Sequence, residues 1–530
     1  MQSARDTVHI TPAEWRWVIF VGGALVLLAF VPFLWVALSG AVGDQWQFMG
    51  VLNNYIDGAT YISKMMQGFE GSWLVYFRHT SEPHNAIFVQ VLYPALGQLA
   101  RVINVPPIAI FHVARVVASL IMYMAMYYFA STVWPRPRSR RIFFIIAAIG
   151  SGLGWVLLIL TGDTTSPDLV IPEIFPFYSS LVNVHFPLTI TCLTLLASNL
   201  VVIFRPGCTD DPSITNGGLA IGAFSFTLSL LYPQSLVPLG LAVTGFIVFY
   251  WLRQRQFSAR EARWLLVLAL PALPMAAYYF AIVNYNPAAA GWNSQNITLA
   301  PNPVIMLIGL GVPLLIALPG IIRAVRRFNQ DGDQLMLIWL ITILIVVYLP
   351  TNVQRRFAVG LMIPIAYFAT RALEDYWFTF ITRRWRYRLL MAVIPTITMS
   401  YVVLLIVNLN VKSGPFLQRD YAAVFQWLST QSESNEVILA SPEVSVWVPA
   451  WVGARVVYAH PYETLSAAVK EQQVENWFKA ESPADCQALI SQYNVRFVIY
   501  GPQEEQLGQT TCLDTLEPVF RYNSVTVYAP

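Results

Sequence analysis

Side chains able to do acid–base chemistry gather in one stretch that follows the first apolar run of the chain. The stretch from residue 53 to residue 84 contains Asp57, Tyr61 and Lys64. On a helix these three side chains share one face, because they are spaced four and three residues apart. A carboxylate in such a place can remove a proton from an attacking hydroxyl group, or bind a metal. A plain helix cap is the alternative, because Asp57 precedes Gly58 as a helix N-cap commonly does.

A second polar group follows in the same stretch, where His79, Glu82 and His84 lie within six residues. Glu82 is a candidate second acid, and the two histidines are candidates for binding phosphate or relaying protons. The alternative is an exposed polar turn before an apolar helix at 86–103. Closeness to Asp57 in the chain favours a functional interpretation.

Two neighbouring arginines, Arg355 and Arg356, lie in a short loop among otherwise apolar segments. The planar guanidinium group binds phosphate oxygens in pairs, which makes a phosphate or diphosphate contact a plausible use for them. An ion pair with a loop acid, or a contact with lipid phosphate, is the competing interpretation. His185, at the mouth of another apolar run, is a further candidate for contacting a substrate.

The chain that must position these residues is a membrane protein. It has 530 residues, of which 56% are hydrophobic and 12% are charged, whereas a soluble protein carries about 25% charged residues. About eleven apolar runs can cross a bilayer, which predicts an α-helical polytopic protein. The first run exceeds the apolar core of a signal peptide, so an uncleaved anchor is expected. The runs lie at 17–38, 108–133, 142–161, 187–204, 218–232, 234–252, 264–283, 303–322, 335–350, 357–373 and 389–409.

Basic residues are concentrated in alternate loops, and this pattern predicts the orientation. Clusters of arginine occur at 136–141, 253–263, 323–327 and 383–388. Positively charged loops stay in the cytoplasm. The N-terminus is therefore predicted to be cytoplasmic, and the loop at 39–107, the loop that holds Arg355 and the C-terminal tail are predicted to lie outside.

The tail changes character after residue 411. Charges return, and short apolar runs alternate with helical patterns, which predicts a small extracytoplasmic α/β domain at 412–530 after a membrane domain at 1–411. A disulfide between Cys486 and Cys512 and two free buried thiols are equally consistent with the sequence. The expected strands are 436–440 and 495–500, and the expected helices are 421–428, 464–480 and 483–493.

This pattern resembles the GT-C superfamily of membrane glycosyltransferases, and within it a bacterial group. The resemblance implies many spans, a large first outer loop with an essential acid, and a soluble C-terminal domain on the same side. It covers nearly the whole chain. The motifs that carry it are Asp57–Gly68, Glu82-Pro-His84, Phe175-Pro-Phe-Tyr178, Gln295-Asn-Ile-Thr298, Gln354-Arg-Arg-Phe357, Gly453–Arg455 and His460–Thr464.

By this resemblance, Asp57 corresponds to the catalytic acid of the first loop and Glu82 to a second acid. Arg355 or Arg356 corresponds to the arginine that holds the donor phosphate. The first loop lacks the closely spaced Asp-x-Asp of metal-dependent members. No cofactor is therefore expected, and a metal-independent mechanism is favoured over one that uses a divalent metal.

The implied function is inverting transfer of a hexosyl or pentosyl group from a polyprenyl-phosphate-linked donor to a glycan, lipid or protein acceptor. It would take place at the outer face of a bacterial plasma membrane, among membrane lipids and without nucleic acid. The expected substrate-binding residues are Tyr61, Lys64, His79, His84, His185, Arg355 and Arg356.

The alternatives are a lipid-linked glycan transporter and a non-catalytic envelope assembly protein. A transporter usually carries ionisable residues near the middle of its spans. Apart from Arg115, the apolar runs hold no Asp, Glu, Lys or Arg at their middles, which argues against a transporter.

Overall fold

The computed structural model describes residues 9–38, 45–205, 207–208, 210–211, 216–328, 332–409 and 414–530. Contacts between residues divide the chain into two compact units. Unit 1 comprises 1–31, 114–278 and 298–407, and unit 2 comprises 32–113, 279–297 and 408–530. Unit 2 therefore combines the loop after the first span with the tail. The expected boundary between residues 411 and 412 lies outside the described residues, and the division into 1–411 and 412–530 stays a prediction.

Apolar helices account for all eleven predicted runs. In the described part of the chain nine helices are long and apolar enough to cross a membrane, and two shorter apolar helices, Gly217–Leu231 and Asp333–Val346, supply the others. The helices of the spans are α1 (Pro12–Leu38), α4 (Pro107–Val133), α5 (Pro137–Ile149), α6 (Gly154–Thr161), α9 (His185–Ile203), α10 (Asn216–Leu231), α11 (Leu236–Gln254), α12 (Ala259–Ala269), α13 (Leu273–Tyr285), α15 (Pro303–Arg327), α16 (Asp333–Val346), α17 (Met362–Ala372) and α19 (Arg383–Val407). Two of the spans are each divided into two helices, α5 with α6 and α12 with α13. The predicted polytopic helical fold is confirmed.

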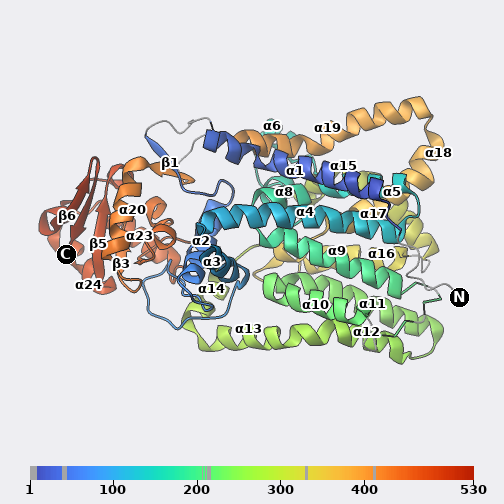
Figure 1. The fold of residues 1–530 in the computed structure, drawn as a ribbon, viewed down its shortest axis with the longest axis horizontal. Helices are drawn as coiled ribbons and strands as arrows, with labels where there is room; N and C mark the ends of the chain where they lie inside the picture. The colour runs from blue at the N-terminus through green and yellow to red at the C-terminus, as the bar shows by residue number, and fades with distance from the viewer. Residues whose placement is uncertain are drawn as a thin grey trace. The chain divides into compact units, whose positions relative to one another are not determined.

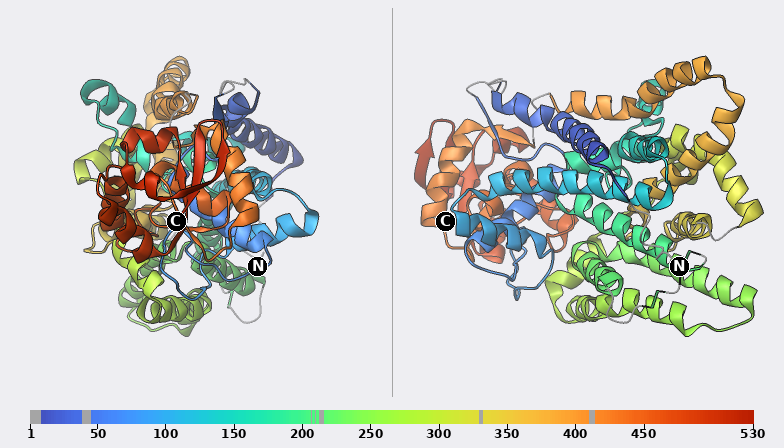
Figure 2. Two further views of the ribbon diagram at one scale, coloured as in Figure 1. Left: turned by 90° about the vertical axis from the view of Figure 1, so that its left-hand side faces the viewer. Right: turned by 45° about the vertical axis from the view of Figure 1, so that its right-hand side comes forward.

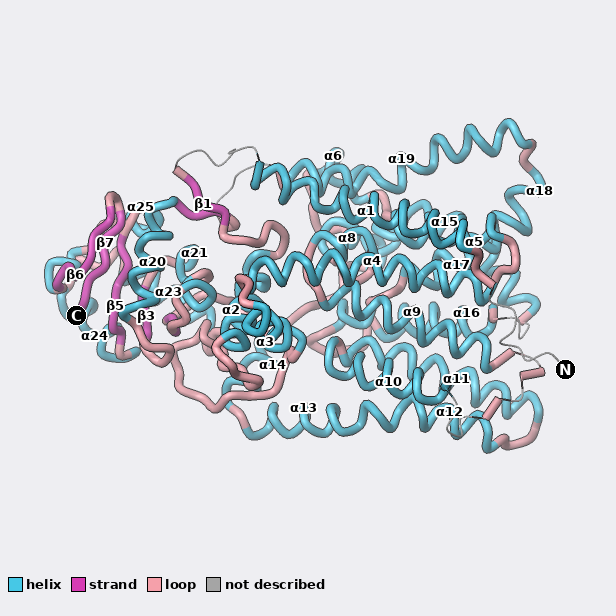
Figure 3. The backbone as a smooth tube through the Cα atoms, viewed as in Figure 1, coloured by secondary structure: helices cyan, strands magenta, loops and turns pink. Residues whose placement is uncertain are grey.

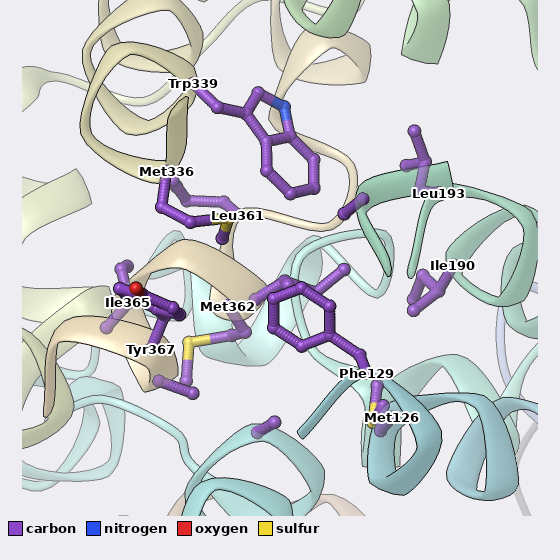
Figure 4. Packing of buried hydrophobic residues seen from close by; sticks show 14 of the residues in the cluster. Met126, Phe129, Ile190, Leu193, Met336, Trp339, Leu361, Met362, Ile365 and Tyr367 are labelled. Carbon is purple, nitrogen blue, oxygen red and sulfur yellow. The ribbon is translucent and has the colours of Figure 1, made fainter. Parts of the chain in front are cut away.

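Unit 1 is built around α17, which packs against α5, α15 and α16. Apart from Arg371, α17 is buried along its whole length. A helix that is apolar all round belongs in the interior of a bundle. Figure 4 shows Met362, Ile365 and Tyr367 of α17 among side chains from neighbouring helices. The helices α9, α10, α11 and α12 run side by side in Figure 1 and stay together in the turned views of Figure 2.

Arg115, the ionisable residue inside a predicted span, has structural partners within unit 1. Its Nη1 donates a hydrogen bond to the carbonyl oxygen of Leu181 at 2.9 Å, and its guanidinium group lies 4.4 Å from the ring of Phe30. These contacts tie the buried guanidinium group to two neighbouring segments of unit 1.

Unit 2 contains a five-stranded sheet formed by the tail, with strand order β4-β3-β5-β7-β6. The strands β3, β4 and β5 are parallel, whereas β7 is antiparallel to both β5 and β6. Helices α20 and α24 pack on these strands, which Figure 3 draws in magenta. The predicted α/β character of the tail is confirmed. The elements are β2 (Phe416–Gln418), α20 (Arg419–Gln431), β3 (Val437–Leu439), α21 (Pro442–Ser445), α22 (Val448–Trp451), β4 (Arg455–Val456), α23 (Ala467–Trp477), α24 (Pro483–Tyr493), β5 (Val495–Tyr500), α25 (Pro502–Leu507), β6 (Glu517–Tyr522) and β7 (Val525–Ala529).

Two features of the tail go beyond the sequence-based expectations. Cys486 and Cys512 form a disulfide, with Cα atoms 5.2 Å apart, so the structure selects one of the two alternatives. The hairpin β6–β7 was not expected from the sequence. It turns at Asn523, whose φ of 46° is in the left-handed region that asparagine tolerates better than most residues.

The first loop supplies two further helices to unit 2, α2 (Tyr55–Phe69) and α3 (Leu92–Ile103). They lie against each other (Figure 1), and their backbones approach closely at Gly68 and Gly97. A Cβ atom on Gly68 would lie 2.2 Å from the oxygen of Pro94, and one on Gly97 would lie 2.0 Å from the oxygen of Met65. Glycine at these two positions therefore allows α2 and α3 to pack this closely.

Candidate functional site

Asp57 lies in the first turn of α2. The residue that precedes this helix, Asn54, has a left-handed backbone conformation. Its carboxylate accepts hydrogen bonds from Nδ2 of Asn54 at 2.6 Å and from Nε2 of His460 at 3.0 Å. The positive end of a helix also favours a negative charge there. The Asp57 side chain is 32% exposed, whereas that of His460 is 3% exposed. The Asp57 carboxylate therefore accepts these two hydrogen bonds while about a third of its side chain stays exposed.

The tautomer of His460 follows from its backbone partners. Its Nδ1 accepts hydrogen bonds from the backbone N–H groups of Tyr462 at 3.0 Å and Glu463 at 3.1 Å. An imidazole nitrogen that accepts hydrogen bonds carries no proton, so the proton of the neutral ring is on Nε2. Nε2 therefore donates to Oδ1 of Asp57.

Lys64, about two turns beyond Asp57 on α2, is buried in an ion pair. Its Nζ lies 2.5 Å from Oε1 of Glu463, and the two side chains are 1% and 3% exposed. Burial alone would raise the pKa of Glu463, but the Lys64 charge beside it holds that pKa below its ordinary value. Tyr61 stacks on Tyr93, with ring centroids 4.2 Å apart. Direct contact of Lys64 or Tyr61 with substrate stays a prediction.

His79 is buried next to the same glutamate. Its Nε2 donates to the carbonyl oxygen of Val446 at 3.2 Å, and its Nδ1 lies 3.9 Å from Oε2 of Glu463. Burial lowers the pKa of His79 from 6.5 to about 3, an effect that the Glu463 charge opposes. His79 is therefore neutral at physiological pH.

This buried histidine predicts a loss of stability in mild acid. Below pH 6.5 His79 becomes protonated in the unfolded chain, whereas in the folded protein it stays neutral down to about pH 3. As the pH falls through this range, His79 therefore lowers the free energy of unfolding by up to about 1.4 kcal/mol per pH unit. In His79→Gln, which can still donate to Val446, we expect the pH dependence of the thermal midpoint between pH 6.5 and 5 to become shallower. Substitution of the exposed His9 by glutamine is the matched control, and an equal slope in both variants would contradict this assignment.

Glu82 and His84 are held by different partners. Glu82 accepts a hydrogen bond from Lys470 Nζ at 2.7 Å and from Thr80 Oγ1 at 2.5 Å. Burial alone would raise the pKa of Glu82, but these hydrogen bonds outweigh it and the pKa lies below its ordinary value. His84 accepts from the backbone N–H of Phe77 at 2.9 Å through Nε2. Its Nδ1 donates to the carbonyl of Glu82 at 2.9 Å, which fixes the loop around them.

Backbone and side-chain pairing brings the tail to this loop. Thr80 and Tyr458 form an antiparallel bridge. Oγ1 of Thr464 donates to the carbonyl oxygen of His79, and the N–H of Leu465 donates to Oγ1 of Thr80 at 3.1 Å. Within unit 2, the segment around His460 is thus fastened to residues 79 and 80.

Residues of the tail complete the site, and the sequence did not reveal their roles. His460, Glu463 and Lys470 supply the partners of Asp57, Lys64 and Glu82. A partial signal existed, because the motif His460–Thr464 is one of those that carry the GT-C resemblance. The pairing itself has no local signal, since His460 and Asp57 are 403 residues apart in the chain.

Unit 1 holds the two arginines in the short helix η3 (Gln354–Ala358). Arg355 lines a cavity of about 310 Å³, whose other walls come from residues 165–171 and 299–305. Helix η3 also packs against the short helix η1 (Pro233–Ser235), which directly follows Tyr232. The ring of His185 stacks on Tyr232, with ring centroids 6.1 Å apart. Arg355, Arg356 and His185 therefore belong to one neighbourhood of unit 1.

Two of the sequence motifs meet at this cavity. The N–H of Arg355 donates to the carbonyl of Thr298 at 3.0 Å, and the N–H of Thr298 donates to the carbonyl of Asn352 at 2.6 Å. Oε1 of Gln354 accepts from the N–H of Ala300 at 3.0 Å. These hydrogen bonds fix the backbone that presents Arg355.

Independence from a divalent metal stays a prediction for this site. Within the residues that the structure describes, no group of three or more His, Cys, Asp or Glu side chains could hold a metal ion. Asp57 is held by Asn54 and His460, whereas Mg²⁺ and Ca²⁺ prefer several oxygen ligands.

The fold of this chain is similar to that of solved membrane glycosyltransferases, and the predicted resemblance to the GT-C superfamily is confirmed for the fold. The chain is similar to ArnT from Cupriavidus metallidurans bound to undecaprenyl phosphate, with a TM-score of 0.57, 12% identity and 98% of each chain covered. It is also similar to the oligosaccharyltransferase AglB from Archaeoglobus fulgidus in complex with an inhibitory peptide and a dolichol-phosphate, with a TM-score of 0.55 and 12% identity over 93% of this chain and 70% of that one.

A third similar structure is the arabinofuranosyltransferase AftD from Mycobacteria, with a TM-score of 0.52 and 13% identity. The similarity covers 97% of this chain and 41% of AftD. No family model matches the chain, and no curated protein matches its sequence.

Proposed function

We propose that this protein is a glycosyltransferase that moves a hexosyl or pentosyl group, with inversion, from a polyprenyl-phosphate-linked donor to a glycan, lipid or protein acceptor. The observation that carries the proposal is Asp57, a reachable carboxylate held by a histidine donor at the start of a helix in a chain with the GT-C fold. Similar structures of ArnT and AglB contain undecaprenyl phosphate and dolichol-phosphate, which supports a lipid-phosphate donor.

In the proposed reaction, the oxygen of an acceptor hydroxyl group attacks the anomeric carbon of the donor sugar. The bond from that carbon to the phosphate oxygen breaks, and its electron pair leaves with the lipid phosphate. Asp57 takes the proton of the acceptor hydroxyl as general base. Arg355 and Arg356 are proposed to bind the donor phosphate, where negative charge grows as the bond breaks.

The proposed location of the reaction is the outer face of a bacterial plasma membrane, with the N-terminus in the cytoplasm. The alternation of arginine-rich loops supports this orientation. The disulfide between Cys486 and Cys512 supports it too, because disulfides persist in oxidising compartments and are rare in the cytosol.

Removal of divalent metals should leave the activity in place. In the proposed reaction Asp57 takes the acceptor proton directly, so the proton transfer uses no metal-bound water. We expect the purified protein to retain its initial rate of transfer after treatment with EDTA. A rate that collapses with EDTA and returns with Mg²⁺, Mn²⁺ or Zn²⁺ would contradict this expectation.

Removal of the Arg355 charge should weaken catalysis strongly. We expect Arg355→Gln to lower kcat/KM by about 10²-fold, the size typical for loss of one donor that stabilises developing charge. A smaller loss is expected for Arg356→Gln, because Arg355 lines the cavity. The control is Arg253→Gln, which removes an exposed charge from α11. Equal rates for the Arg355 and Arg253 variants would reject the role in phosphate binding.

The function itself is tested in a deletion strain and in vitro. Mass spectrometry of lipid extracts should show a polyprenyl-phosphate-linked sugar that accumulates in the deletion strain and disappears on complementation. Purified full-length protein is then supplied with undecaprenyl-phosphate-linked glucose, mannose or arabinose and membranes of the deletion strain. Transfer of label with release of undecaprenyl phosphate supports the proposal. Unchanged lipid pools together with no turnover of any donor would reject it, and movement of the donor across the bilayer without bond cleavage would indicate a transporter.

A further inference from the structure

We infer that His460 is a positioning residue for the general base, and that the tail is therefore a working part of the catalytic site. This inference rests on the proposed function of Asp57. It assigns to one side chain of the tail the task of orienting the Asp57 carboxylate and keeping it ionised. His460 is buried and reaches Asp57 directly, so it acts through the carboxylate instead of through contact with substrate.

The first support is the fixed direction of the hydrogen bond. Two backbone N–H groups occupy Nδ1 of His460, so the neutral ring presents an N–H at Nε2 to Oδ1 of Asp57 at 3.0 Å. A donor aimed at a carboxylate favours its charged form over its protonated form. It also holds the carboxylate plane in one orientation, which general base catalysis requires.

The second support is the set of charges around the histidine. Glu463 lies three residues further along the chain, and its backbone N–H donates to the His460 ring. Lys64 neutralises the Glu463 carboxylate, and the His79 ring lies 6.2 Å from that of His460. The Glu463 carboxylate is thus paired with Lys64, and His79 is itself neutral. Asp57 is the carboxylate to which Nε2 of His460 donates.

The third support is the way in which the His460 segment is held. Oγ1 of Thr464 accepts the backbone N–H of His460 at 3.1 Å and donates to the carbonyl of His79. The amide of Gln295 donates to the carbonyl of Thr464 at 2.7 Å. His460 is therefore locked by contacts to two other segments of unit 2. A histidine that merely filled space would not require this arrangement.

Two substitutions separate the donor from the rest of the ring. In His460→Asn, the amide oxygen can replace Nδ1 as acceptor for Tyr462 and Glu463, but no donor reaches Asp57. In His460→Gln, the amide nitrogen can replace Nε2 as donor to Asp57. We expect His460→Asn to lower kcat/KM at neutral pH at least tenfold, because a hydrogen bond to a charged group contributes a factor of about 10 to 100. We expect His460→Gln to recover most of that loss.

The pH profile gives a readout that a structural role would not change. In His460→Asn the acid limb of the profile of kcat/KM should move upward by about one pH unit, because the carboxylate loses the donor that favours its charged form. Both variants should keep the thermal midpoint of the wild-type protein within a few degrees. The substrate for all rates is the undecaprenyl-phosphate-linked sugar that the wild-type protein turns over.

The outcomes distinguish the two proposals. If Asp57→Asn is inactive while His460→Asn keeps the wild-type rate and pH profile, the positioning role is wrong and the proposed function stands. If Asp57→Asn is fully active, the proposed function of Asp57 is wrong and the inference falls with it. If His460→Asn and His460→Gln lose activity equally and both lower the thermal midpoint, His460 is structural and the inference is overturned.

Discussion

Replacing Asp57 by asparagine should lower kcat for sugar transfer by about 10²- to 10⁴-fold, the usual contribution of a general base. The amide oxygen of asparagine can still accept the hydrogen bond from His460, so the fold should be unaffected. The binding of donor should change little, because the lost group acts on the acceptor proton. The measurement is single-turnover transfer of label from the undecaprenyl-phosphate-linked sugar, with the thermal midpoint recorded on the same sample.

The matched control for this variant is Glu70→Gln. Glu70 lies at the other end of α2, where it pairs with Arg78 and its side chain is 48% exposed. Both substitutions remove one negative charge from the same helix, so a general electrostatic effect would slow both. A wild-type kcat in Asp57→Asn, at an unchanged thermal midpoint, would eliminate Asp57 as the base.

Loss of the Lys64 charge should destabilise the protein by about 3–5 kcal/mol, the cost typical of breaking a buried ion pair. In Lys64→Met, Glu463 stays buried without the ammonium group that lies 2.5 Å from it. The double variant Lys64→Met with Glu463→Gln should recover much of the loss, because no uncompensated buried charge remains. The measurement is denaturant and thermal unfolding of the full chain in detergent, followed by tryptophan fluorescence.

An exposed pair in the same tail provides the comparison. Lys479 and Glu475 are one helical turn apart, with atoms 3.8 Å from each other and side chains 52% and 39% exposed. Exposed pairs contribute about 1 kcal/mol or less, so Lys479→Met should shift the unfolding midpoint only slightly. Equal shifts for Lys64→Met and Lys479→Met would show that the buried pair does not support this part of unit 2.

The helical spans could be predicted because their cause is local. An apolar run of sufficient length favours the membrane over water regardless of which segments surround it in the fold. Pro233 marks the break between α10 and α11, because proline interrupts a helix. The strands Val437–Leu439 and Val495–Tyr500 were predictable for a similar reason, since short apolar runs lie between turn residues. The hairpin β6–β7 was missed because its strands are mostly polar or exposed, apart from Val525 and Val527.

The candidate site was predicted only in part. Asp57 and Glu82 are side chains with 32% and 37% exposure, consistent with groups that substrates can reach. Lys64 and His79 were predicted as substrate contacts from their chemistry and nearness in sequence. The structure instead places both of them inside unit 2, where Glu463 lies next to each, and any contact with substrate stays a prediction.

The amino-acid sequence alone determined the membrane-spanning character, the positions of the eleven helices, the α/β tail and the chemical groups that are present. These follow from hydropathy and spacing, which act over a few residues. Only the tertiary structure decided that a histidine of the tail donates to Asp57 and that tail residues pair with Lys64 and Glu82. The physical reason is that a buried polar contact depends on which segments meet after folding. When the two segments are some 400 residues apart, no local sequence pattern indicates that they will be in contact.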